Sequence, residues 1–291
     1  MIKLGYSISL PIKKKSNDKD QTSSTSNIDL INELSTKFDC VQIMFSKTII
    51  SNSEINEIKS IVSKYKFIYV HASYQINIGA NLIALEDNLY NGTMDILLNE
   101  ITWANKINAR AIVLHMGKNV KNKYDPLIVY NNMVKFIIEL FKKIKKNKIQ
   151  ILLETPARQK GDMCWDINEF VEFVKNFSGQ SFYSQLGICL DTCHMFQTGL
   201  DLNNSNVIVQ IHKILKPIQN KIQLIHLNDS YHPVGSGIDR HQQIGHGYIQ
   251  TNQLVKFIYP YKNIPMILET MGPYDEQIQL IKQNQNKNKI I

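Results

Sequence analysis

The sequence of 291 residues lacks three features that would direct its interpretation elsewhere. It has only four cysteines and no CxxC pair, too few for a disulfide framework in a chain of this length, so we expect reduced thiols. No apolar run approaches the roughly 20 residues that a membrane-spanning helix needs. The first twelve residues are apolar and three lysines follow them, the reverse of a secretory signal. We therefore expect an intracellular protein with no membrane partner.

The composition is that of a globular protein with an excess of positive charge. Hydrophobic residues make up 43% of the chain and charged residues 20%, which is enough to bury a sizeable core. The net charge of +8 suits a partner rich in phosphate, such as nucleic acid. A lysine-rich composition can give the same excess without any such partner. Charge alone therefore leaves both interpretations open.

Six short apolar runs end on a His, an Asp or a Glu. Continuous runs of Ile, Val and Leu are typical of parallel strands that are covered on both faces. In a closed parallel barrel the carboxyl ends of all the strands open onto one mouth, so these polar side chains would converge there. The six residues are His71, His115, Glu154, Asp191, His226 and Glu269.

Segments with helical periodicity lie between the apolar runs. With two more strands at Lys3–Ser9 and Val41–Phe45, the chain alternates strand and helix eight times, which predicts a TIM (β/α)8 barrel of one domain over residues 1–291. A doubly wound sheet is the alternative, but it would gather ligands at one switch point. A mobile loop is expected at 13–27 and a polar tail at 283–291. Helices are expected at 28–38, 53–64, 84–107, 133–144, 167–176, 205–215, 252–258 and 274–282.

Three further candidate ligands, His194, Asp239 and His241, lie off the strand ends. Burying so many carboxylates in one mouth would cost several kcal/mol per ion without a compensating cation, so the cluster indicates bound metal. Nitrogen and oxygen donors favour zinc, with manganese or iron as alternatives. Nine donors suit two or three ions, which favours hydrolysis of a phosphate ester. We expect the neighbouring Cys189 and Cys193 to pack in the core and not to bind metal.

At these residues the sequence resembles the endonuclease IV family of apurinic/apyrimidinic (AP) endonucleases, also called AP endonuclease family 2. The resemblance spans roughly residues 3 to 282, and the motifs occur in the family's order. The matching segments are His71–Asn77, Leu114–Gly117, Leu153–Thr155, Gly187–His194, His226–Asp229, Gly235–His241 and Ile267–Thr270.

The resemblance implies a TIM barrel that holds three zinc ions. Glu154 would be shared by the first two ions and would be catalytic together with Glu269. The implied ligands are His71, His115 and Glu154 for the first ion, Glu154, Asp191, His226 and Glu269 for the second, and His194, Asp239 and His241 for the third.

The implied activity is a step of DNA base excision repair carried out by a monomer. The enzyme would hydrolyse the phosphodiester 5′ to an abasic site in double-stranded DNA, leave a 3′-hydroxyl, and remove 3′-blocking groups as a second, 3′-diesterase activity. Tyr74 would hold the DNA around the extruded abasic sugar, which flips at low cost because its base is missing.

The sequence departs from the family's pattern at four places. Ser7 stands where the family usually has His, and His246 stands where Glu is typical. The loop at 46–50 lacks the Arg that bacterial relatives insert into the DNA, and Gln75 replaces an apolar wedge. These changes leave the nine candidate ligands intact but remove the family's usual means of entering the duplex.

Two other functions remain as alternatives. A sugar isomerase or epimerase with the same barrel would use Glu154, Asp191, His226 and Glu269 around a divalent ion, but it would leave the other candidates and the positive charge unexplained. A catalytically silent protein that binds damaged DNA would not need a complete ligand set. Metal content and incision of an abasic duplex would discriminate among the three.

Overall fold

Eight parallel strands form the centre of the computed structural model, which describes residues 2–10, 31–45, 50–80, 87–144 and 148–288. The strands are β1 (Leu4–Leu10), β2 (Cys40–Phe45), β3 (Phe67–His71), β4 (Ala111–His115), β5 (Gln150–Glu154), β6 (Leu186–Asp191), β7 (Ile222–His226) and β10 (Met266–Leu268). They close into a barrel in the order β1, β10, β7, β6, β5, β4, β3, β2. The predicted TIM barrel is confirmed, and the doubly wound alternative is wrong.

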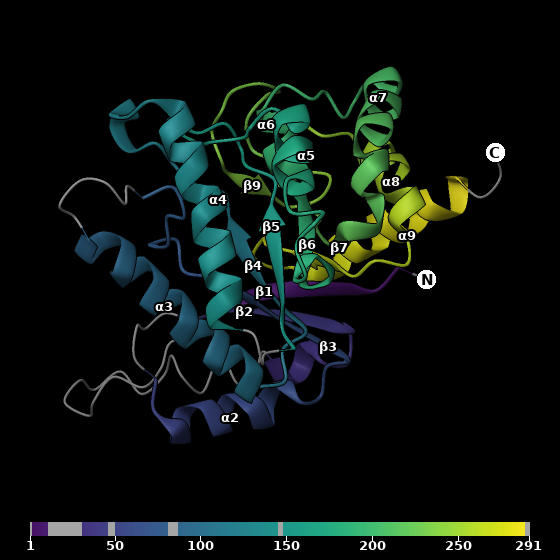
Figure 1. Cartoon of the computed structure of the whole chain (residues 1–291). Coiled ribbons are helices and arrows are strands. Elements are labelled where there is room, and N and C mark those ends of the chain that lie inside the picture. Colours follow the sequence, from purple (N-terminus) through teal and green to yellow (C-terminus); the bar gives the residue numbers. More distant parts are fainter. Residues whose placement is uncertain (1, 11–30, 46–49, 81–86, 145–147, 289–291) are drawn as a thin grey trace.

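Helices cover the outside of this barrel (Figure 1). Several begin at a polar cap, because the side chains of Ser51, Asp125, Asp166 and Asn204 accept N–H groups of the first turn. The helices are α2 (Asn52–Val62), α3 (Asp87–Lys106), α4 (Pro126–Lys143), α5 (Ile167–Lys175), α6 (Thr192–Gln197), α7 (Ser205–Leu215), α8 (Thr251–Ile258) and α9 (Tyr274–Asn288). Short 3₁₀ helices are formed by Val120–Asn122, Tyr183–Gln185, Lys216–Lys221 and Tyr259–Tyr261.

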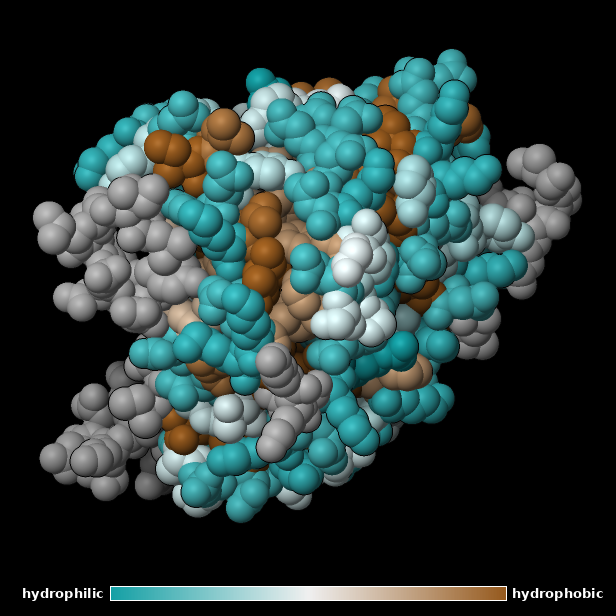
Figure 2. All heavy atoms as spheres, viewed as in Figure 1, coloured by the Kyte–Doolittle hydropathy of each residue, from teal (hydrophilic) through white to brown (hydrophobic). Residues whose placement is uncertain are grey.

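The outer surface over these helices is mostly hydrophilic, and hydrophobic side chains are visible between α4 and α5 (Figure 2). Within the described part of the chain, no helix combines the length and the apolar character needed to cross a bilayer.

The ends of the chain depart from the sequence-based expectation. Helix α9 continues to Asn288, so residues 283–288 are helical where a polar tail was expected. Neither Gly nor Pro follows Lys282, and the Asn284 side chain donates to the Leu280 carbonyl, so no local signal ends the helix. The expected loop at 13–27 lies outside the described residues. Of the helix expected at 28–38, residues 31–34 are helical.

The interior of the barrel is a packed core below a polar mouth. A compact layer of buried side chains fills it: Cys40, Tyr69, Ala111, Val113, Leu152, Cys189, Leu224 and Ile267. Since side chains alternate along a strand, the residue two positions further also points inward. Six residues of this layer lie two positions before a candidate ligand, as Leu152 lies two positions before Glu154. The strand period therefore directs all six into the mouth.

Gly5 lies at a close approach between β1 and its two neighbouring strands. It pairs with Cys40 on one side and Ile267 on the other. A Cβ atom at Gly5 would lie 2.5 Å from the Cβ of Cys40 and 2.6 Å from the Cδ1 of Ile267. No side chain larger than hydrogen fits there without displacing a strand.

We expect Gly5→Ala to lower the free energy of unfolding by about 1–3 kcal/mol, because overpacking forces the neighbouring strands apart. Urea denaturation would measure the loss. Gly179→Ala is the matched control, since nothing lies within 4 Å of its Cβ position. Equal stability of both variants would contradict the packing argument.

Candidate metal centre

Glu154, at the end of β5, lies at the centre of the mouth. It is 1% exposed. Its Oε2 lies 3.0 Å from the Nε2 of His115 and 3.3 Å from the Nε2 of His71. Its Oε1 lies 2.8 Å from the Nδ1 of His226 and 3.5 Å from the Nδ1 of His194. One carboxylate therefore contacts imidazoles from four different parts of the chain.

The structure brings all nine candidate ligands together in three groups. Within each group, the potential ligand atoms lie within 4.8 Å of one another. Glu154 belongs to two groups, as the resemblance implies. Among the described residues, the three groups that hold the candidate ligands are His71, His115 and Glu154, then Glu154, Asp191, His226 and Glu269, and then His194, Asp239 and His241.

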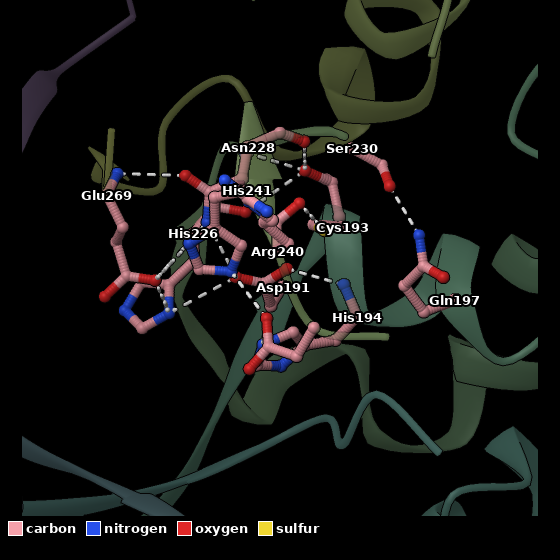
Figure 3. Close-up of polar contacts among 12 residues, drawn as sticks. Asp191, Cys193, His194, Gln197, His226, Asn228, Ser230, Arg240, His241 and Glu269 are labelled. Carbon is pink, nitrogen blue, oxygen red and sulfur yellow. Dashed lines mark hydrogen bonds and ion pairs between the residues drawn. The ribbon is translucent and has the colours of Figure 1, made fainter. Parts of the chain in front are cut away.

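Helix α6, which the sequence-based analysis did not predict, places His194. Asp191 is its N-cap and accepts the backbone N–H of His194 at 2.7 Å (Figure 3). The Nδ1 of His194 lies 2.8 Å from the carbonyl oxygen of Thr155. That contact turns Nε2 toward the Oδ1 of Asp239, 3.1 Å away. A single helical turn thus connects the second group to the third.

A small hairpin positions the remaining two residues. Strand β8 (Asp229–Ser230) pairs antiparallel with β9 (His241–Gln242) in the long connection after β7. The Nε2 of His241 then lies 3.3 Å from the Oδ1 of Asp239. The Nε2 atoms of His194 and His241 are buried, and in the described part of the chain neither forms a hydrogen bond of good geometry, although both lie within ion-pair distance of Asp239. Two imidazole nitrogens that face one carboxylate without a well-formed hydrogen bond are an arrangement that a cation would complete.

The charges of the centre reinforce one another. Burial alone would raise the pKa of Glu154, but His226 and His115 outweigh it and hold the pKa well below its usual range. Likewise, burial favours a raised pKa for Glu269, yet His226 and His241 lower it to about 2. Burial lowers the pKa of His194, but Asp191 and Asp239 raise it well above its usual value. The carboxylates thus stay charged, and the compensating positive charge is either protons on the imidazoles or metal ions that replace those protons.

Cys193 lies near this centre without sharing its chemistry. With Asp191 and His241 it forms a fourth group of neighbouring donor atoms. Burial, however, raises the pKa of its thiol, so the neutral form is favoured, and only the thiolate is a good ligand. The Sγ atom lies 3.7 Å from the carbonyl oxygen of Arg240. This position agrees with the packing role expected for it.

Two buried amides that sequence reasoning did not single out support the ligands. Asn228 donates to the Oδ2 of Asp191 at 2.7 Å and accepts the backbone N–H of Glu269 at 2.9 Å (Figure 3). Gln42, on β2, contacts Glu269 and His226. Gln42 could have been noticed in the sequence, because it is the polar residue inside the apolar run Cys40–Phe45. Asn228 lies within a matching motif but carried no assigned role.

Asp229 anchors the loop that carries Asp239 and His241. Its carboxylate is fully buried and accepts four backbone N–H groups. The Oδ1 atom accepts from Ser230 at 2.7 Å and Ile249 at 2.8 Å. The Oδ2 atom accepts from Gly245 at 3.1 Å and Gly247 at 2.9 Å.

We expect Asp229→Asn to lower the free energy of unfolding by roughly 2–4 kcal/mol. The new NH2 group would oppose two backbone donors, and each buried unsatisfied group costs about 1–3 kcal/mol. Thermal denaturation would measure the effect. The control is Asp275→Asn, because the Asp275 side chain is 74% exposed. A loss no larger than that of the control would contradict the anchoring role.

The other predicted residues lie around this centre. Tyr74 is 64% exposed at the mouth, with its ring centroid 5.3 Å from that of His71 and 5.1 Å from that of His115. A cavity of about 520 Å³ opens beside it and reaches Glu154, His194 and Asp239. The exposed His246 instead lies 3.4 Å from Glu276 and belongs to none of the three groups.

Sequence comparison identifies the family. Residues 30–286 match the family described as Xylose isomerase-like TIM barrel. Probable endonuclease 4 of Mesomycoplasma hyopneumoniae (strain J) is 34% identical over 221 residues, which cover 74% of this chain and 75% of that protein. The chain belongs to the endonuclease IV family. The resemblance to this family that the ligand motifs indicated is thus confirmed over 74% of the chain.

Structural comparison shows that this endonuclease IV family member shares its fold with proteins described by other names. Endonuclease IV from Thermus thermophilus superimposes with a TM-score of 0.73 and 19% identity, covering 98% of this chain and 99% of that one. A D-tagatose 3-epimerase-like protein gives the same TM-score and identity, with 100% of both chains covered. The backbone alone therefore does not separate the two activities.

Proposed function

We propose that the protein is a zinc-dependent AP endonuclease of DNA repair. It hydrolyses the phosphodiester 5′ to an abasic site in duplex DNA and leaves a 3′-hydroxyl, and the same centre removes 3′-blocking groups. The observation that carries this proposal is the third group, formed by His194, Asp239 and His241. A sugar epimerase needs only the group around Glu154 and Glu269, so it has no use for the additional three.

The donor set fits zinc. It offers imidazole nitrogens and carboxylate oxygens, and the thiol of Cys193 is held neutral by its burial. The Nε2 atoms of His194 and His241 face Asp239 without forming a hydrogen bond of good geometry, so their lone pairs are available to such an ion. When bound, zinc supplies Lewis acidity at the phosphate and lowers the pKa of the attacking water. The proposed ligands are the three groups described above, with Glu154 shared.

The residues of the chain itself would orient the metal ligands and receive the substrate. Glu154 holds four imidazoles in fixed directions, while Asn228 keeps Asp191 and the backbone of Glu269 in place. Tyr74 stands at the rim, where its exposed ring would pack against DNA around the extruded sugar. The cavity beside it, at about 520 Å³, lies within the size range of small-molecule sites and would accept that sugar.

Incision of a defined duplex tests the proposal. The zinc-loaded protein is expected to cut DNA that carries a tetrahydrofuran abasic analogue, which a β-elimination lyase cannot cleave. The product should have a 3′-hydroxyl that a polymerase extends, and an undamaged duplex of the same sequence should remain intact. Metal analysis should give about three ions per chain. Failure to incise with three ions bound would overturn the proposed activity, and epimerase activity with one or two ions would support the alternative.

A further inference from the structure

Gln42 has a place in the centre that none of the ligand motifs covers. It is fully buried on β2, at the level of the mouth. Its Nε2 donates to the Oε1 of Glu269 at 2.7 Å and to the Oγ of Ser7 at 3.3 Å. Its Oε1 lies 2.9 Å from the Nε2 of His226. Both the nitrogen and the oxygen of the Gln42 carboxamide therefore have hydrogen-bond partners inside the barrel.

These contacts require a hydrogen on the Nε2 of His226. An ionised carboxylate only accepts hydrogen bonds, so the NH2 group of Gln42 must face Glu269. The carbonyl oxygen of Gln42 then faces His226, and it accepts a hydrogen bond only if the Nε2 of His226 carries hydrogen. The Nδ1 of His226 faces the carboxylates of Glu154 and Glu269, and a bound metal ion would take the place of a proton on this nitrogen, so that only the Nε2–H would remain.

The opposite ring nitrogen lies where a ligand atom is needed. The Nδ1 of His226 is 2.8 Å from the Oε1 of Glu154 and 3.1 Å from the Oε2 of Glu269. It is 3.7 Å from the Oδ2 of Asp191. Gln42 thus holds the Oε1 of Glu269, while the Oε2 of Glu269 and the Nδ1 of His226 both face the second group.

Ser7 makes room for this arrangement. It pairs with Gln42 in the register of β1 and β2, and its small side chain accepts the second N–H of the amide. The amide from β2 therefore occupies the space next to Glu269 that a larger residue on β1 would fill.

We propose that Gln42 is a positioning residue that fixes the Nε2–H tautomer of His226 and orients Glu269, so that both present their ligand atoms to the second metal ion. This inference rests on the proposed function. Hydrogen bonds of this kind to ligating groups typically raise metal affinity roughly 10–100-fold. Gln42 itself touches neither the metal nor the substrate.

Zinc titration of Gln42→Met tests the role, because methionine has a similar volume but offers neither hydrogen bond. At a free zinc concentration that just saturates wild type, we expect the variant to retain two ions per chain. The ion of the second group should bind roughly 10–100-fold more weakly than in wild type. Gln150→Met is the matched control on β5, since its side-chain oxygen has no partner among the described residues. It should retain all three ions.

A second variant and a second measurement separate positioning from folding. Gln42→Asn keeps the amide but shortens its reach by about 1.5 Å, so it should also lose one ion. Loss of the amide leaves Glu269 and His226 without these buried partners, so the unfolding temperature of zinc-free Gln42→Met should fall. A purely structural role would give the same fall and leave the zinc count unchanged, so the weaker binding of zinc is the result that shows positioning. Wild-type affinity in both variants, with incision intact, would overturn this inference alone. A wild-type protein that binds no zinc and does not incise would overturn the proposed function as well.

Discussion

Glu154→Gln should abolish incision, with a loss on the order of 1,000-fold or more, or about 4 kcal/mol of transition-state stabilisation. Both oxygens of Glu154 face imidazoles, and the first two groups share this residue. A glutamine keeps one oxygen but places an NH2 group where the other carboxylate oxygen faces an imidazole. Since the contact surface for DNA is unchanged, duplex binding should remain measurable.

Single-turnover incision and fluorescence anisotropy would measure the two properties separately. Glu172→Gln is a suitable control, because the side chain of Glu172 is 65% exposed and pairs with Lys175 on the surface. It should leave both properties intact. If Glu154→Gln incised at the wild-type rate, Glu154 would not be a shared ligand.

Removal of metal should have the second largest effect. Dialysis against a strong chelator is expected to end incision and to lower the unfolding temperature by roughly 5–15 °C, since a ligand at about 1,000 times its Kd contributes about 4 kcal/mol. The physical reason is the crowding of Glu154, Asp191, Asp239 and Glu269, whose charges would lose their metal counterions. Differential scanning calorimetry with and without chelator would measure the shift.

Readdition separates metal loss from irreversible damage. Zinc should restore both activity and unfolding temperature, and magnesium should restore neither, because imidazole is a poor ligand for it. Full activity in the presence of excess chelator, with no metal found by elemental analysis, would contradict a metal-dependent mechanism.

Much of the centre was predictable because strand periodicity acts locally. An apolar run that ends on a polar residue shows both the strand and the direction of its last side chain, as Ile151–Leu153 does before Glu154. The fold followed from the same runs. The residues off the strand ends were recognised as candidates, but their grouping rested on the resemblance.

The supporting contacts were not predictable in this way. Gln42 meets His226 only because β1 closes the barrel between β2 and β10. Helix α6 and the pairing of β8 with β9 are too short for a periodic pattern to appear in the sequence. The length of α9 was missed because a polar composition indicates exposure and not the absence of helix.

The capping turn of α6 has a consequence for how the centre can change. Asp191 and His194 are the N-cap and N3 residues of one helix, so the backbone of that turn sets the spacing between the second and third groups. Each residue of an α-helix advances about 100° around the axis. One residue inserted between these two would rotate the imidazole away from Thr155 and separate the second group from the third. The turn that begins α6 therefore constrains divergence of this protein, because a change of its length changes the distance between the two groups.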